Sequence, residues 1–264
     1  MVRRRDCLRL LAAGLPGPFL RGAASFPTTV ADRVDRRYKT TGARPNGLQA
    51  TRDGIWILDA ETGVASLVHY LTGEADKEIP TPAVYGSGIT FDGLSIWVSS
   101  ANNRKLIRVD VETGEVQTEY EVPGAGPVKW RAAPDEPAEI GGCGIEWRSG
   151  ELFVSVPPAA AVQVIKAQDG SLLRSLPAPG IRPHGLGWDP DGSLWCTDCN
   201  SRSFFKMDPA SGKILKQHML PFASPEVGGK VVVPHGMSIW QRMIYFCSPD
   251  TGELYRTPLI NRMS

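Results

Sequence analysis

Two histidines occupy equivalent places in a stretch that this chain repeats. His184 belongs to the stretch PHGL at 183–186, and His235 belongs to PHGM at 234–237. Earlier copies carry Asn46, Ser87 and Cys143 before the same glycine. Imidazoles bind divalent cations when neutral and transfer protons near neutral pH, so such side chains converging on one point could do metal or acid–base chemistry. The alternative is that each side chain only hydrogen-bonds a neighbouring repeat.

Charged side chains accompany these positions at fixed offsets. Asp59 and Asp198 lie near the end of the second strand expected in their repeats, beside the residue that precedes the glycine. A carboxylate beside an imidazole fixes its tautomer and raises its basicity, although an aspartate at a strand end also commonly accepts backbone N–H groups. Arg44 and Arg182 come two residues before the same positions. Their guanidinium groups could attract a carboxylate, lactone or phosphate oxygen, or could simply be solvated.

These patterns predict the residues of one site. The predicted catalytic residues are His184, His235 and Asp198, and the predicted substrate-binding residues are Arg44, Arg182 and Ser87. The predicted ligands of a divalent metal, Mg²⁺, Ca²⁺ or Zn²⁺, are Asn46, Asp59, Cys143, His184 and His235.

The repeat itself predicts the elements that position these side chains. A unit of about forty residues recurs, and that period is typical of a β-propeller, with one four-stranded antiparallel blade per unit. Each copy begins with the glycine-containing strand, continues through a turn into a strand with an aromatic residue, and adds a third strand before a Gly turn. The repeats span about 44–81, 86–124, 141–180, 182–221 and 233–260, with an insertion at 123–142.

Closure of the ring needs a strand from elsewhere in the chain. The fifth repeat ends after its third strand, and an unpaired edge is costly, so we expect Thr28–Thr41 to supply the missing strand. The sequence therefore predicts an all-β propeller with five visible blades, closed by an N-terminal strand. A degenerate sixth blade built around the insertions is the alternative. In either case residues 25–264 would form a single domain.

The first 24 residues have the order of a bacterial twin-arginine export signal. Arginines at 3–5 precede a short apolar stretch, Leu10 to Leu20, and then small residues up to Ala24. A basic N-terminal tail is the alternative. Export predicts a periplasmic or secreted protein and the twin-arginine machinery as a partner. Without the signal the chain has a slight excess of acidic residues, which argues against nucleic-acid binding. The sequence has no run of about 20 apolar residues, so it does not predict an integral membrane protein.

Four cysteines would remain after removal of the signal. They are Cys143, Cys196, Cys199 and Cys247. In an oxidising compartment an even number suggests disulfides, and four cysteines allow three pairings. Buried inert thiols, a metal site or a redox pair at Cys196 and Cys199 are the alternatives, and the spacing does not choose among them.

Two stretches resemble known propeller families. The repeat PHGLGWDPDGSLWCTD at 183–198 resembles that of the virginiamycin B lyase (streptogramin lyase) family. The stretches RPNGL at 44–48 and WILD at 56–59 are similar to the SMP-30/gluconolactonase and NHL-repeat propellers. The first resemblance implies a divalent metal, usually Mg²⁺, and a histidine that acts in a β-elimination opening a cyclic ester. The second implies a metal-dependent lactonase.

Two hypotheses about function follow. The first is an exported, metal-assisted lyase or hydrolase that acts on a small cyclic ester or lactone at the upper rim of the central channel, with His184 or His235 moving a proton. The second is a non-catalytic propeller that binds a protein or small ligand through the same rim. Both predict a small-molecule ligand or a partner at this rim.

Overall fold

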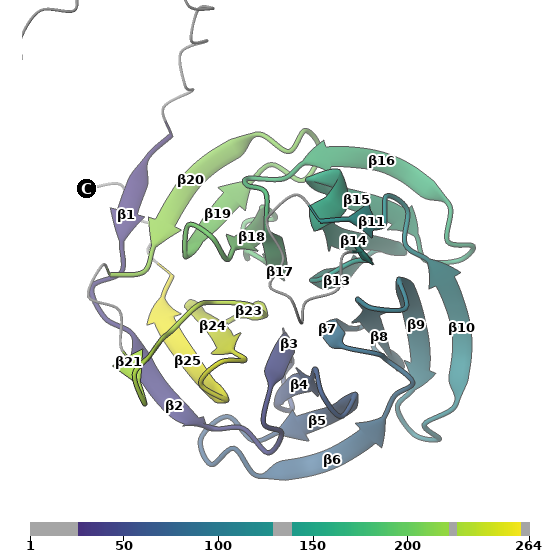
Figure 1. Cartoon of the computed structure of the whole chain (residues 1–264), viewed down its shortest axis with the longest axis horizontal. Helices are drawn as coiled ribbons and strands as arrows, with labels where there is room; N and C mark the ends of the chain where they lie inside the picture. The colour runs from purple at the N-terminus through teal and green to yellow at the C-terminus, as the bar shows by residue number, and fades with distance from the viewer. Residues whose placement is uncertain (1–25, 129–138, 222–225, 260–264) are drawn as a thin grey trace, which may run out of the picture.

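Five blades of four antiparallel strands surround a central axis (Figure 1). The computed structural model describes residues 26–128, 139–221 and 226–259. Within these ranges the only helical element is a 3₁₀ turn, Pro157–Ala159. The repeat thus correctly predicted an all-β propeller, and the described residues form five blades rather than six.

Each blade places its first strand at the axis and its fourth at the outside. Blade 1 contains β3 (Pro45–Ala50), β4 (Ile55–Asp59), β5 (Val64–Val68) and β6 (Ala75–Pro80). Blade 2 contains β7 (Gly86–Phe91), β8 (Ser95–Ser100), β9 (Lys105–Asp110) and β10 (Val116–Glu121). Blade 3 contains β13 (Ile145–Arg148), β14 (Glu151–Val156), β15 (Ala161–Lys166) and β16 (Leu172–Pro177). Blade 4 contains β17 (Pro183–Trp188), β18 (Leu194–Asp198), β19 (Ser203–Met207) and β20 (Ile214–Met219). Blade 5 contains β23 (Met237–Trp240), β24 (Met243–Ser248), β25 (Glu253–Pro258) and β2 (Asp35–Lys39).

Burial follows this order from axis to edge. Every residue of β8 is buried, whereas β10 at the outer edge has no buried residue and exposes four of its six side chains. Apolar clusters fill the gaps between neighbouring blades, and the cluster around Leu48 and Tyr245 joins blade 1 to blade 5. The hydrophobic core is therefore a ring of inter-blade layers, which holds the first strands rigidly around the axis.

The turn between the third and fourth strands has a local cause. In blade 2 the Asp110 carboxylate accepts the backbone N–H groups of Glu112 and Thr113 at 2.8 and 2.9 Å. Gly114 follows at a φ of 73°, a conformation that glycine adopts without steric cost. This combination explains the Gly turn that marks each repeat in the sequence.

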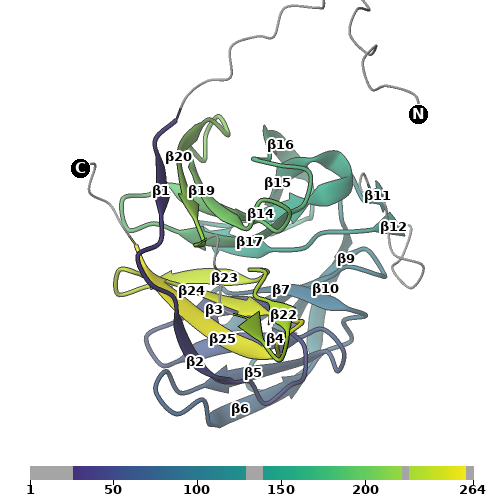
Figure 2. The ribbon, with the colours of Figure 1, turned by 60° about the vertical axis from the view of Figure 1, so that its left-hand side comes forward.

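The N-terminal segment closes the ring, but only part of it pairs with blade 5. As predicted, β2 is antiparallel to β25, and Arg256 Nε lies 3.2 Å from Asp35 Oδ2. The preceding strand, β1 (Thr28–Val30), instead runs parallel to β20 of blade 4. The expectation that all of 28–41 would join the last blade was therefore wrong for β1. Figures 1 and 2 show why: the chain passes the outer edge of blade 4 before it reaches blade 5.

Removal of this segment is expected to lower the melting temperature in two steps. Deletion of residues up to 41 leaves the outer edge of β25 without its partner strand. We expect a fall of roughly 10 °C, since each kcal/mol lost shifts the Tm by about 2–4 °C in a domain of this size. Deletion up to 31 removes β1 alone and should lower the Tm less. Calorimetry of both truncations checks this, and equal melting temperatures for the full chain and the longer deletion would contradict it.

Glycines close the central channel at its waist. They are Gly47, Gly88, Gly144, Gly185 and Gly236, one per blade. A Cβ atom added at any of them would come within 3 Å of the backbone of the next blade, so only glycine allows the five strands to approach so closely. The cavity on the axis at this level has no room for a water molecule. The space above the waist is therefore a blind pocket.

Polar side chains fill the axis below the waist. Thr90 Oγ1 donates to Gln49 Oε1 at 2.6 Å and lies 3.4 Å from Glu146 Oε2, while Gln49 Nε2 donates to Ser238 Oγ at 3.5 Å. Burial raises the pKa of the Glu146 carboxyl well above its usual range. These four residues belong to four different blades, so their contacts also tie the ring together.

Two insertions add short hairpins outside the blades. The first contains β11 (Gly126–Pro127) and β12 (Glu139–Ile140), and the second contains β21 (Glu226–Val227) and β22 (Lys230–Val231). Residues 129–138 of the first lie outside the described residues. In the described part of the chain, no helix has the length and apolar character needed to cross a membrane.

Candidate functional site

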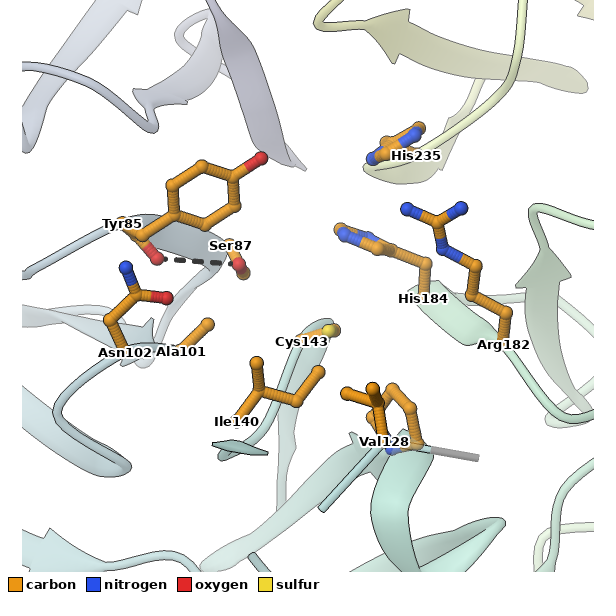
Figure 3. Close-up of a pocket in the computed structure, with 11 residues that line it drawn as sticks. Tyr85, Ser87, Ala101, Asn102, Val128, Ile140, Cys143, Arg182, His184 and His235 are labelled. Atoms are coloured by element: carbon orange, nitrogen blue, oxygen red, sulfur yellow. Dashed lines mark hydrogen bonds between the residues drawn. The ribbon is translucent and has the colours of Figure 1, made fainter. Parts of the chain in front are cut away.

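A pocket opens at the upper end of the channel, where the first strands begin (Figure 3). Its cavity volume is about 70 Å³. Side chains from four blades and the first insertion line it, and most of the lining is apolar. The lining residues are Tyr85, Ser87, Ala101, Asn102, Val128, Ile140, Cys143, Pro157, Arg182, His184 and His235.

The two predicted histidines lie side by side in this pocket. The centroids of the His184 and His235 rings are 4.7 Å apart, with the ring planes tilted by 54°. His184 is the second residue of β17 and is 5% exposed, while His235 lies two residues before β23 and is partly exposed. Figure 3 shows both imidazoles beside the Arg182 guanidinium. Equivalent positions in adjacent blades thus converge, as the repeat predicted.

Both imidazoles are neutral near pH 7. The pKa of His184 lies well below its usual range, chiefly because the ring is buried. The neighbouring His235 and the positive charge of Arg182 lower it further. Burial and the charges of Arg182 and Arg44 lower the pKa of His235 to about 3. The Nδ1 atom of His184 is buried, and no hydrogen-bond partner for it lies among the described residues. The site therefore holds an unprotonated imidazole pair with one unsatisfied polar atom.

These histidines are expected to destabilise the fold in acid. Because their folded pKa values lie below the unfolded value of about 6.5, only the unfolded chain gains protons as the pH falls below that value. The stabilisation is complete above about pH 6.5 and is lost as the pH falls towards the folded pKa. For His235, with a pKa of about 3, the loss between pH 7 and pH 5 is roughly 2 kcal/mol. Urea unfolding at both pH values measures it, and an equal loss in His235→Gln would contradict the assignment.

Asn46 and Ser87 connect His235 to the neighbouring blades. Asn46 Oδ1 lies 3.0 Å from His235 Nδ1. The Asn46 amide donates to Gly86 O at 3.1 Å and to Ser87 Oγ at 3.2 Å, and Ser87 donates in turn to Tyr85 O at 3.3 Å. Figure 3 shows the last of these bonds at the pocket wall. Three of the five residues predicted at equivalent positions, Asn46, Ser87 and His235, therefore form one hydrogen-bonded chain.

The predicted aspartates bind backbone groups. Asp59 Oδ2 accepts the N–H of Arg44 at 2.7 Å, and Asp198 Oδ2 accepts the N–H of Arg182 at 3.1 Å. Asp198 Oδ1 also accepts the N–H of Ser201 at 2.8 Å. These bonds hold the strand ends, and His184 Nδ1 has no partner. The orienting role expected of Asp198 towards His184 is therefore not supported by this geometry.

The four cysteines within the described residues are buried free thiols rather than disulfides. Cys143 lies in the pocket, where burial raises the pKa of its thiol to about 12. Burial likewise raises the pKa of Cys247 to about 12, and those of Cys196 and Cys199 also rise. A thiol rather than a thiolate is present near pH 7, so none of these four is an activated nucleophile.

The donors in the pocket do not by themselves form a metal site. Among the described residues, no three or more His, Cys, Asp or Glu side chains are grouped as metal ligands would be. His235 Nδ1 is bonded to Asn46, and the Cys143 thiol is protonated near pH 7. A divalent metal therefore remains a prediction, and proton transfer by the two histidines does not require it.

Of the two predicted arginines, Arg182 lines the pocket and Arg44 does not, while a residue at the same offset in another repeat also lines it. Arg182 lines the pocket, and the Arg44 guanidinium lies 5.9 Å from the centre of the Tyr85 ring. Tyr85 precedes Ser87 by two residues, the same offset at which Arg44 precedes Asn46 and Arg182 precedes His184. It was nevertheless not predicted as a site residue. Val128 and Ile140 belong to an insertion without a repeat register, so no sequence signal placed them here.

Comparisons with known proteins establish the fold. No protein-family model matches the sequence, and no curated relative matches it either. Glutaminyl cyclase from Myxococcus xanthus is similar in structure, with a TM-score of 0.68 and 13% identity over 88% of this chain and 97% of that one. Virginiamycin B lyase from Staphylococcus aureus has a TM-score of 0.53 and 16% identity over 86% of this chain and 99% of that one. The chain thus shares the β-propeller fold of both, including the lyase that its repeats resemble.

Proposed function

We propose that this propeller is an enzyme that opens a small cyclic ester or lactone in its upper pocket, with the His184–His235 pair moving the proton. One observation carries the proposal. The pair is neutral, lies in a blind pocket and includes a buried nitrogen without a partner. A neutral imidazole can accept a proton from a bound substrate or water without first losing one of its own.

Two reactions fit this arrangement. In an elimination, one imidazole removes a proton from the carbon next to a carbonyl, a double bond forms, the carbon–oxygen bond at the β position breaks, and a carboxylate leaves. In a hydrolysis, the imidazole removes a proton from water, the hydroxide adds to the ester carbonyl, and the alcohol leaves with a proton. The second imidazole lies beside the first, with the ring centroids 4.7 Å apart, so either ring can face the same bound substrate.

Structural neighbours support the catalytic alternative over a pure binding role. One solved structure is described as a catalytically inactive His-to-Ala variant of virginiamycin B lyase with quinupristin, and it has a TM-score of 0.50 and 18% identity over 82% of this chain and 66% of that one. A histidine therefore matters for activity on the same fold. We favour elimination for this reason. The metal assistance predicted from the family resemblance remains a separate prediction.

Export belongs to the same proposal. The twin-arginine order of the first 24 residues supports a periplasmic or secreted enzyme, and these residues lie outside the described part of the chain. A substrate met outside the cytoplasm fits an enzyme that inactivates or degrades a small cyclic compound. Fractionation of cells that express the full chain would test this location.

A turnover screen in ¹⁸O-labelled water tests the reaction. Aliphatic lactones, aromatic lactones and cyclic depsipeptides are incubated with the protein, and the products are analysed by mass spectrometry. Elimination gives an unsaturated product without ¹⁸O, whereas hydrolysis introduces one ¹⁸O atom. Binding of these compounds without any turnover would overturn the proposal in favour of a binding module.

A further inference from the structure

Asn46 reaches His235 from another blade and is held rigidly. It lies on β3 of blade 1, is fully buried, and makes hydrogen bonds to blade 2 and to His235, two residues before β23 of blade 5. Its backbone is fixed as well, because a Cβ atom at Gly236 would come within 2.5 Å of Asn46 O. The side-chain amide therefore presents a fixed pattern of donor and acceptor to the imidazole.

The hydrogen-bond partners determine which way this amide faces. Gly86 O can only accept, so the group 3.1 Å from it must be the amide NH₂. The other end of the amide, Oδ1, can only accept, and it lies 3.0 Å from His235 Nδ1. His235 Nδ1 must then carry the proton, which leaves the lone pair on Nε2.

We propose that Asn46 is a positioning residue that holds His235 in the tautomer with a proton on Nδ1 and so makes Nε2 the proton acceptor of the site. This proposal rests on the proposed function for its catalytic meaning, whereas the tautomer itself is a property of the folded chain. In the other tautomer two lone pairs would face each other at 3.0 Å, and a buried acceptor would lose its donor.

An amide suits this role because it carries no charge. A carboxylate at the same place would also accept from Nδ1, but it would stabilise the imidazolium and keep the histidine protonated to higher pH. With Asn46 the imidazole is oriented and stays neutral. Arg44 and Arg182 act in the same direction, because both are cationic groups near His235 and disfavour its protonation.

Nitrogen-15 NMR of the histidine side chains tests the proposal directly. Two-bond ¹H–¹⁵N spectra distinguish the two tautomers, and the signal that disappears in His235→Ala identifies His235 among the four histidines of the chain. The parent protein is expected to show Nδ1 protonated and Nε2 unprotonated at pH 7. Asn46→Leu should give a mixture of tautomers. The opposite tautomer in the parent, or an unchanged tautomer in Asn46→Leu, would overturn the proposal.

A second variant keeps the test decisive if Asn46→Leu does not fold. Asn46→Asp retains the acceptor, so His235 should keep its tautomer while its pKa rises towards the ordinary imidazole range, and the acid limb of kcat/KM should move to higher pH. Ser87→Ala is the matched control for the tautomer, since it removes a partner of the Asn46 NH₂ group but leaves Oδ1 in place. An unchanged His235 pKa in Asn46→Asp would contradict the contact.

The activity readout separates this proposal from the proposed function. If a substrate is found, Asn46→Leu should lower kcat by about tenfold with little change in KM, because only the fraction of His235 in the competent tautomer can act. If no substrate is turned over, the proposed function fails, and the NMR result still decides whether Asn46 fixes the tautomer.

Discussion

His235→Ala and His184→Ala are each expected to lower kcat by about 10²-fold or more, as loss of a general acid or base does. Both side chains lie in the pocket, and each deletion leaves one neutral imidazole without its neighbour at 4.7 Å. Steady-state kinetics on the best substrate of the turnover screen measures the effect. Circular dichroism and urea unfolding establish that the variants are folded.

His218→Phe provides a matched control for these variants. His218 is also buried, and its pKa is lowered to about 4, chiefly by burial, but it lies on β20 at the outside of blade 4 and bonds to Thr29. This change should alter stability and leave kcat near the parent value. Turnover at the parent level in the His184 and His235 double variant would reject the site.

The pH dependence of activity gives an independent check on the same pair. A base with an ordinary imidazole pKa would lose its activity below about pH 6.5. The lowered pKa values of His184 and His235 place the acid limb of kcat/KM below that value. The enzyme is therefore expected to remain active in mildly acidic solution for as long as the fold survives.

The repeat made the convergence of the histidines predictable. Residues at the same place in successive repeats must meet around the axis once the units close into a ring, whatever the details of their packing. The repeat alone was therefore enough to predict that His184 and His235 lie close together. The contact between Asn46 and His235 joins the first and last blades, so it depends on the number of blades and on how the ring closes. The sequence predicted closure by an N-terminal strand but left the number of blades open, with five visible and a sixth as the alternative.

Local chemistry explains what the sequence could not decide. Asp198 stands beside His184 in its repeat, yet its carboxylate satisfies the backbone N–H groups of Arg182 and Ser201, as Asp59 does for the equivalent turn. A carboxylate at a strand end has both options, and the sequence does not show which donors come within 3 Å. The insertions follow no repeat, so their contribution of Val128 and Ile140 to the pocket depends on tertiary packing alone.

Gly185→Ala is expected to destabilise the protein more than any other single methyl addition in β17. The new Cβ would lie 2.4 Å from both His235 O and Met237 N, which are backbone atoms of the next blade. Gly185 N also donates to His235 O at 3.0 Å, so neither strand can move without losing this bond. We expect a loss of about 3 kcal/mol, at the upper end of the usual cost of overpacking, and a fall in Tm of about 6–12 °C.

Gly187→Ala separates this close approach from a general effect of replacing glycine in a strand. Gly187 lies two residues further along β17, and a Cβ there would meet Met237, Ser238 and Ile239 atoms at 3.3–3.5 Å, close to ordinary contact distance. Its stability should stay within about 1 kcal/mol of the parent. Urea unfolding of the two variants side by side is the measurement. Equal stabilities would show that the blades can separate at the waist, and the pocket could then no longer be regarded as closed from below. A large loss confined to Gly185→Ala would instead link the stability of the ring to the position of His235. The His235 carbonyl oxygen both accepts the hydrogen bond of Gly185 N–H and is the atom that the new Cβ would meet.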